Sequence, residues 1–115
     1  MVTVMLKWYK ELYIGKHAEK RIDRFRSRID QGKRLPRIWL ISLASNGRDQ
    51  LDIFDARNLY QPAFRARCPM IVGVASDYGE ALELVIRIAD DVYLGRGDGN
   101  IRAWLEGREE HPQGL

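Results

Sequence analysis

The sequence predicts an α+β fold, a two-layer sandwich in which three or four mostly antiparallel strands carry two main helices. Apolar residues recur at helical spacing in two segments, which predicts helices over 17–31 and 78–94. Segments rich in β-branched and aromatic residues, at 38–44, 51–56 and 70–75, are typical of strands. The chain has 115 residues, of which 45% are hydrophobic, and this is the length and apolar content of a single domain with its own core.

The N-terminal segment, residues 3–14, fits two patterns. Met5 and Trp8 follow a helical period, whereas Leu12-Tyr13-Ile14 before Gly15 is typical of a short strand. We predict an extended segment that ends at Gly15, because glycine commonly interrupts a strand at a turn.

The first predicted helix has one narrow apolar stripe and polar residues everywhere else. Gly32 stands where a left-handed residue is expected to end the helix, and Pro36 prevents it from continuing. Such a helix lies on the surface of a domain and contacts the core through its stripe alone. The stripe residues are spaced by four, three and four positions: Ala18, Ile22, Phe25 and Ile29.

The strands at 38–44 and 70–75 are apolar on both faces, which indicates central strands that need cover on each side. Asn46-Gly47 is a turn signal and joins the first of them to the next strand as an antiparallel pair. Two helices on one side of the sheet would leave the other face open. We therefore expect the N-terminal segment or a partner to cover it, with self-association through this face or through Trp8, Tyr9 and their neighbours.

The second predicted helix begins near Tyr78, because Asp77 and Glu80 have the spacing of a capping box. Its apolar residues cover a wide face, so we expect it to be well buried. We place its end at Leu94, with Gly95 as the terminating residue.

The remaining segments complete one domain. Residues 58–69 contain two prolines and are predicted to be an irregular connector, and residues 101–105 are predicted to form a short closing strand. The single α+β domain therefore covers residues 1–105, and residues 106–115 are predicted to be a polar, flexible tail.

The composition favours a reducing compartment. Cys68 is the only cysteine, so no intramolecular disulfide can form, whereas small secreted domains often contain several. The N-terminus lacks the basic region, apolar stretch and cleavage site of a signal peptide. No apolar run approaches the roughly 20 residues of a membrane span. We expect a cytoplasmic protein with no membrane partner.

The charge is unevenly distributed, although the net charge is only +3. Residues 16–37 contain nine basic and three acidic side chains, whereas residues 77–94 contain five acidic side chains and one basic side chain. At about 100° per residue, four basic residues fall on one flank of the first helix, and two more follow in the next segment. The predicted anion-binding or nucleic-acid-binding residues are Lys20, Arg21, Arg24, Arg28, Arg34 and Arg37.

Like charges lie one helical turn apart in the pairs Lys20–Arg24 and Arg24–Arg28, and each pair costs about 0.2–0.5 kcal/mol in an isolated helix. A solvated charged face is the simplest interpretation. The functional interpretation is a non-enzymatic interaction or regulatory module that binds an anionic or protein partner through this face. Nucleic-acid binding is an alternative, but the aromatic residues lie in apolar strands rather than between the basic residues. An enzyme with a site not visible in the sequence is the other alternative, and a concave site with converging polar groups would favour it.

The sequence indicates no catalytic residues, no metal and no cofactor. Cys68 would need a base to act as a nucleophile, and the only histidines are His17 and His111. One cysteine and two distant histidines do not make a zinc site. Asp52 and Asp55 point to opposite faces of a regular strand, which disfavours an acid–base pair.

Six segments spread over most of the chain carry a resemblance to known proteins: Leu12-Tyr13-Ile14-Gly15, Leu43-Ala44-Ser45-Asn46, Leu51-Asp52-Ile53, Gln61-Pro62, Ile71-Val72-Gly73-Val74-Ala75 and Gly79-Glu80-Ala81-Leu82-Glu83-Leu84-Val85. Together they resemble a group of small uncharacterised proteins from Firmicutes. This group has no assigned activity. The resemblance therefore implies a common fold and no particular catalytic or binding residues.

Overall fold

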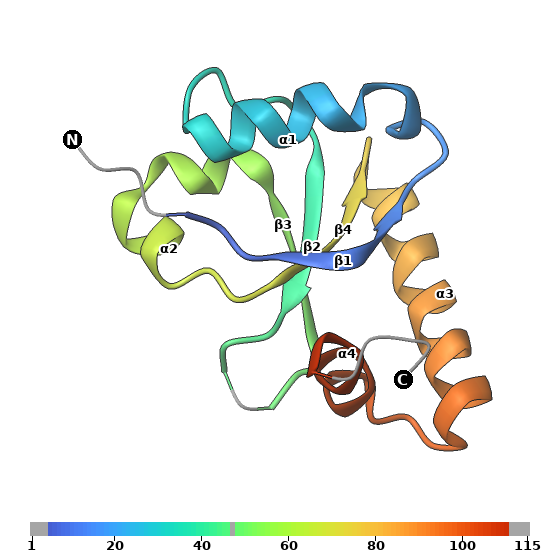
Figure 1. The fold of residues 1–115 in the computed structure, drawn as a ribbon. Coiled ribbons are helices and arrows are strands. Elements are labelled where there is room, and N and C mark those ends of the chain that lie inside the picture. The colour runs from blue at the N-terminus through green and yellow to red at the C-terminus, as the bar shows by residue number, and fades with distance from the viewer. Residues whose placement is uncertain (1–4, 47, 111–115) are drawn as a thin grey trace.

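The computed structural model describes residues 5–46 and 48–110, which form a four-stranded mixed sheet with helices around it (Figure 1). The predicted α+β class is confirmed. The strands are β1 (Trp8–Ile14), β2 (Trp39–Leu43), β3 (Leu51–Asp55) and β4 (Ile71–Ala75). The helices are α1 (Ile22–Gln31), α2 (Pro62–Ala66), α3 (Tyr78–Arg96) and α4 (Ile101–Glu110), with the 3-10 helices η1 (Glu19–Arg21) and η2 (Ala56–Tyr60).

The strand order across the sheet is β1-β4-β2-β3. β2 runs antiparallel to both β3 and β4, as predicted for β2 and β3, whereas β1 is parallel to β4. Ile41 of β2 pairs with Ile53 on one side and Gly73 on the other, so the centre of the sheet is apolar. The N-terminal segment is extended, as predicted, and it forms an edge strand rather than a cover over one face.

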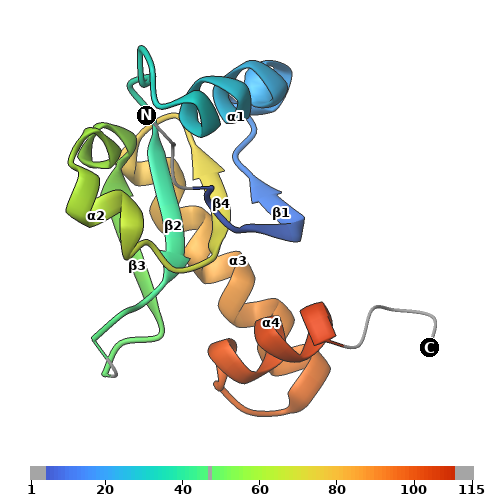
Figure 2. The same cartoon turned by 60° about the vertical axis from the view of Figure 1, so that its left-hand side comes forward.

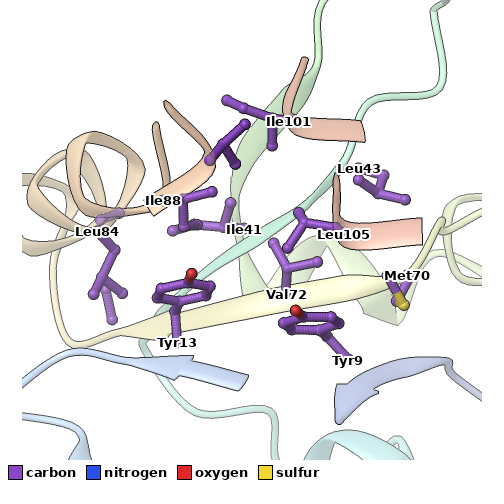
Figure 3. Close-up of a cluster of buried hydrophobic side chains, with 13 residues drawn as sticks. Tyr9, Tyr13, Ile41, Leu43, Met70, Val72, Leu84, Ile88, Ile101 and Leu105 are labelled. Atoms are coloured by element: carbon purple, nitrogen blue, oxygen red, sulfur yellow. The ribbon is translucent and has the colours of Figure 1, made fainter. Parts of the chain in front are cut away.

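Helices lie on both faces of the sheet, which differs from the predicted two-layer sandwich (Figure 2). In Figure 3, Leu105 of α4 lies close to Val72 of the sheet, and Leu84 of α3 belongs to the same buried cluster farther along β4. On the opposite face, a second buried cluster joins α1 and η2 to the strands. The physical reason is that the central strands are apolar on both sides: Leu40 belongs to one cluster and Ile41 to the other. Helices from this chain therefore provide the cover that we expected from the N-terminal segment or a partner.

Tyr9 of β1 belongs to the cluster under α3 and α4, and only 2% of its surface is exposed. Trp8, on the other face of the strand, is half-buried against the α1 side. Tyr9 is therefore not accessible for the predicted self-association through Trp8 and Tyr9, because other parts of the chain cover it.

The first predicted helix is divided into η1 and α1, which begins at Ile22. Gly32 has a φ of 71°, and its N–H donates to the carbonyls of Arg28 and Ile29 at 3.0 and 3.1 Å. This confirms the predicted left-handed cap. Ile29 is the one fully buried residue of α1. The helix is therefore held to the domain by a narrow contact, as its sequence pattern indicates.

Residues 56–66 are largely helical, where the sequence predicts an irregular connector from residue 58 onwards. The side chain of Asp55 caps η2, and Pro62 occupies the first turn of α2. Arg65 of α2 is buried, and its guanidinium donates to the carbonyl of Asp30 at 2.8 Å. This hydrogen bond connects α2 to the C-terminal end of α1.

α3 begins as predicted, because the Asp77 carboxylate accepts a hydrogen bond from the N–H of Glu80 at 2.8 Å. The helix ends at Arg96, two residues later than predicted, and the left-handed residue after it is Gly97, with a φ of 82°. Gly95 lies inside the helix. A side chain there would collide with the ring of Trp104, so this glycine permits α4 to approach α3 closely.

Residues 101–105 form the first half of α4 rather than the predicted closing strand. The Asn100 side chain accepts from the N–H of Ala103 at 3.1 Å, as the residue before a helix commonly does. Ile101 and Leu105, one helical turn apart, are both buried in the core. Asparagine is common both in turns and at the start of helices, so the residue type alone does not distinguish the two.

α4 continues through residues 106–110, where the sequence predicts a flexible tail. Arg108 forms an ion pair with Glu11 of β1, and its guanidinium lies 4.4 Å from the centre of the Trp104 ring. These contacts hold α4 against the edge of the sheet. Residues 111–115 of the predicted tail lie outside the described residues. Of the helices that the structure describes, none has the length and apolarity needed to cross a membrane.

Candidate anion-binding surface

The six predicted anion-binding residues lie in three consecutive parts of the chain rather than along one helix. Two are in η1 and two are on α1, and the last two belong to the segment that leads from α1 into β2. Arg28 is half-buried and the other five side chains are exposed. We call these residues the basic surface: Lys20, Arg21, Arg24, Arg28, Arg34 and Arg37.

None of the six side chains forms a salt bridge within the described residues, 5–46 and 48–110. Some arginines elsewhere in the described chain are paired: Arg57 contacts Asp55 at 2.7 Å, and Arg96 contacts Asp98 at 3.0 Å. The side-chain hydrogen bond from Arg57 lowers the pKa of Asp55, and the nearby charge of Arg37 lowers this pKa further. Arg37 therefore has one acidic neighbour, although the two residues form no salt bridge.

The acidic helix α3 packs on the opposite face of the sheet from α1 (Figure 2), although its first turn reaches the segment before η1, where Glu80 contacts His17. α1 itself also carries acidic residues. Among these, Asp30 accepts a hydrogen bond from the indole N–H of Trp8 at 2.8 Å. Arg26 lies 4.9 Å from the centre of the same indole ring. The polar side of α1 that faces β1 is therefore occupied by contacts within the chain, whereas the basic surface is not.

Arg34 has a backbone conformation that is unusual for its residue type. Its φ is 50°, in the left-handed region, and among the described residues it is the only one other than glycine with a positive φ. A side chain in this region costs about 1 kcal/mol relative to glycine. The chain thus carries an exposed cation at a position where glycine would be less strained.

A cleft of about 450 Å³ lies near the other end of the sheet and is a candidate site for a small ligand. It is lined by side chains from distant parts of the chain, including Lys7, Cys68, Arg102 and Glu106. Arg102 donates to Glu106 at 3.0 Å and also to the carbonyl of Ala44. The sequence offered no signal for this grouping, because the residues meet only after β1 and α4 have packed.

The Cys68 thiol donates to the carbonyl of Pro69 at 3.3 Å and is half-buried. Burial raises its pKa to about 11, against a smaller opposing effect of the Arg65 charge. The thiol is therefore protonated at neutral pH, which agrees with the interpretation of Cys68 as structural. His111 lies outside the described residues. Within the described part of the chain, no group of three or more potential ligand side chains could hold a metal ion.

His17 contacts Glu80, which is buried at the start of α3. The Glu80 carboxylate accepts from the backbone N–H of Ser76 at 2.9 Å, from the backbone N–H of His17 at 3.1 Å, and lies 2.7 Å from His17 Nδ1. Burial raises the pKa of Glu80, but these hydrogen bonds outweigh it and the pKa lies below its usual range. A side chain at Gly15 would collide with this carboxylate. The cluster joins the end of β1 to α3 and has a structural role.

Searches of known protein families, of curated proteins and of solved structures found no match to this chain. The resemblance to the group of Firmicutes proteins therefore stays a prediction. The candidate sites are supported by the geometry and charge of the chain itself.

Proposed function

We propose that this protein is a non-enzymatic interaction or regulatory module that binds an anionic partner through the basic surface. The observation that carries the proposal is the grouping of six cations in η1, α1 and the following segment, none of which forms a salt bridge in the described residues. Arg57, Arg96 and Arg102 each have a carboxylate partner, whereas the basic surface has no salt bridge in the described residues. Unpaired cations grouped on one side attract polyanions and raise their rate of association.

Two further observations support this proposal. α3 packs on the opposite face of the sheet from α1, so distance weakens the effect of most of its acidic side chains on the cations of α1. Arg34 retains a strained backbone that glycine would relieve, and strain of this kind concentrates at functional positions. A cytoplasmic location belongs to the same proposal, because one protonated thiol suits a reducing compartment.

The direct test is a fluorescence anisotropy titration at low salt with four labelled polyanions: duplex RNA, duplex DNA, heparin and poly-glutamate. If the basic surface contacts about four phosphates, the logarithm of the binding constant should fall with the logarithm of salt with a slope of about −3 to −4. Comparison of the four probes separates a nucleic acid from a sulfated or a carboxylate partner.

The variant Arg24→Gln with Arg28→Gln removes two charges from α1. We expect binding to weaken at least about 10-fold and the salt slope to become shallower by about 2. The matched control is Arg48→Gln with Arg96→Gln, which lowers the net charge equally at positions away from α1. Absence of binding to all four probes, or an equal loss in both double variants, would contradict the proposal.

A further inference from the structure

One edge of the sheet is available for pairing. β3 is the last strand and pairs only with β2 in the described chain. The N–H of Ala44 donates to the carbonyl of Gln50, and the N–H of Ala56 donates to the carbonyl of Ile38. The even-numbered residues of β3 therefore form the hydrogen-bonded pairs with β2. The alternation of such a ladder directs the main-chain groups of the odd-numbered residues of β3 away from β2. The outward-directed residues are Leu51, Ile53 and Asp55.

An exposed apolar stripe on α3 lies on the same face of the sheet as the Ile53 side chain. It has the spacing of one helix side, and its members are 43% to 64% exposed: Tyr78, Leu82, Ile86 and Tyr93. The opposite side of α3 contacts β1, since Asp91 accepts from the Tyr13 hydroxyl at 2.7 Å. Tyr78 packs edge-on against Trp39 of β2, with ring centres 5.2 Å apart. The stripe therefore faces the β3 side of the sheet.

We infer that a second copy of this chain pairs with the open edge, with β3 antiparallel to the partner's β3 about a two-fold axis at Ile53. A two-fold axis at an outward-directed residue lets Ile53 exchange both main-chain hydrogen bonds with the partner's Ile53. Leu51 then pairs with the partner's Asp55. The sheets of the two copies become continuous, and the two α3 stripes face each other on one side of it.

The charges along β3 suit this register. Asp52 lies opposite the partner's Phe54 and Asp55 lies opposite the partner's Leu51, so no like charges face each other along the paired strands. Asp49 and Arg57 are equally distant from Ile53 along the chain. The two-fold axis therefore brings each Asp49 to the end of the partner's strand that carries Arg57, which favours pairing.

The area available is sufficient for a stable dimer. A half-exposed tyrosine leaves on the order of 100 Å² for contact, so the stripe contributes about 400 Å² per copy, and the open strand edge adds to this. Both copies together exceed about 1,000 Å², the lower limit for a specific interface. Pairing of the short β3 with the partner's β3 would be weak by itself, and the stripe on α3 provides the apolar contact that the strands lack.

The first test measures mass. Light scattering coupled to size-exclusion chromatography at micromolar concentration should give twice the 13.4 kDa of one chain. Ile86→Glu places a charge in the stripe at a 62% exposed position and should weaken the dimer at least about 10-fold. The matched control is Leu94→Glu, because Leu94 is 84% exposed on the same helix but lies outside the stripe. A monomeric wild type, or equal effects of the two variants, would overturn the inference.

The second test measures the register. In a Cys68→Ala background, Ile53→Cys places two thiols across the axis, where the Cα atoms of a hydrogen-bonded pair are about 5.5 Å apart. Mild oxidation should give a covalent dimer in high yield. The control Ser45→Cys is exposed in the β2–β3 connection and far from the axis, so it should remain monomeric on a non-reducing gel. Equal crosslinking at both positions would reject this register.

Discussion

The two faces of the sheet are covered by helices with opposite surface chemistry. α1 buries a single residue, Ile29, and presents charge to solvent. α3 buries five residues, and yet leaves a stripe of tyrosines and aliphatic side chains exposed. The depth to which a helix is buried and the character of its outer surface therefore vary independently in this molecule. A narrowly attached helix here presents a surface suited to anions, whereas a deeply buried helix presents one suited to an apolar partner.

The largest expected effect tests how firmly each helix is attached. Ile88 of α3 and Ile29 of α1 are both fully buried, so truncation of either to alanine leaves a cavity. We expect Ile88→Ala to lower the free energy of unfolding by about 4 kcal/mol and Ile29→Ala by about 2 kcal/mol, because α1 can shift to fill the space. Urea denaturation measures both values. A larger loss for Ile29→Ala than for Ile88→Ala would contradict the view that α1 is attached less firmly than α3.

A smaller effect tests the connection between β1 and α3. Glu80→Gln removes the charge that accepts hydrogen bonds from Ser76 and His17, and we expect a loss of about 2 kcal/mol at neutral pH. Because folding lowers the pKa of Glu80, its contribution is present above the ordinary carboxyl pKa of about 4.3 and disappears as the pH falls through the folded value. The difference between wild type and variant should therefore shrink below about pH 4.

The matched control for this prediction is Glu83→Gln, an exposed position on the same helix. It should change the free energy of unfolding by less than about 0.5 kcal/mol at any pH. A pH-independent loss in Glu80→Gln would show that its role is packing rather than charge.

The smallest expected effect has the opposite sign. Arg34→Gly relieves the positive φ and should stabilise the fold by up to about 1 kcal/mol while weakening polyanion binding. Lys33→Gly is the control, because Lys33 has a negative φ and glycine there should destabilise by about 0.5–1 kcal/mol. Thermal unfolding measures both variants. Destabilisation by Arg34→Gly would mean that the side chain contributes more to packing than its strain costs.

Sequence reasoning succeeded where one local signal decides the outcome. Gly32 ends α1 and the Asp77 carboxylate begins α3, as their spacing predicted. It failed where two local signals compete. Gly95 is typical of a residue that ends a helix but permits the close approach of Trp104, and residues 101–105 have the composition of a strand but begin a helix. In both cases the decision depends on the packing of α3 against α4, which no short segment contains.

The residues of the basic surface could be named from the sequence, because consecutive positions stay close together in any fold. Their lack of salt bridges could not be predicted, since it depends on where the acidic helix lies. The cleft residues Lys7 and Arg102 come from opposite ends of the chain, and only the packed structure brings them together.

By itself, the sequence determined the α+β class, the three strands at the centre of the chain, the C-terminal cap of α1, the N-terminal cap of α3, and the unequal charge of these two helices. The tertiary structure decided the number of layers, the helical conformation of residues 101–110 and the open edge at β3. The physical reason is the range of the interactions. Caps, turns and amphipathic patterns act within a few residues, whereas the side of the sheet that a helix covers depends on contacts between segments far apart in the chain.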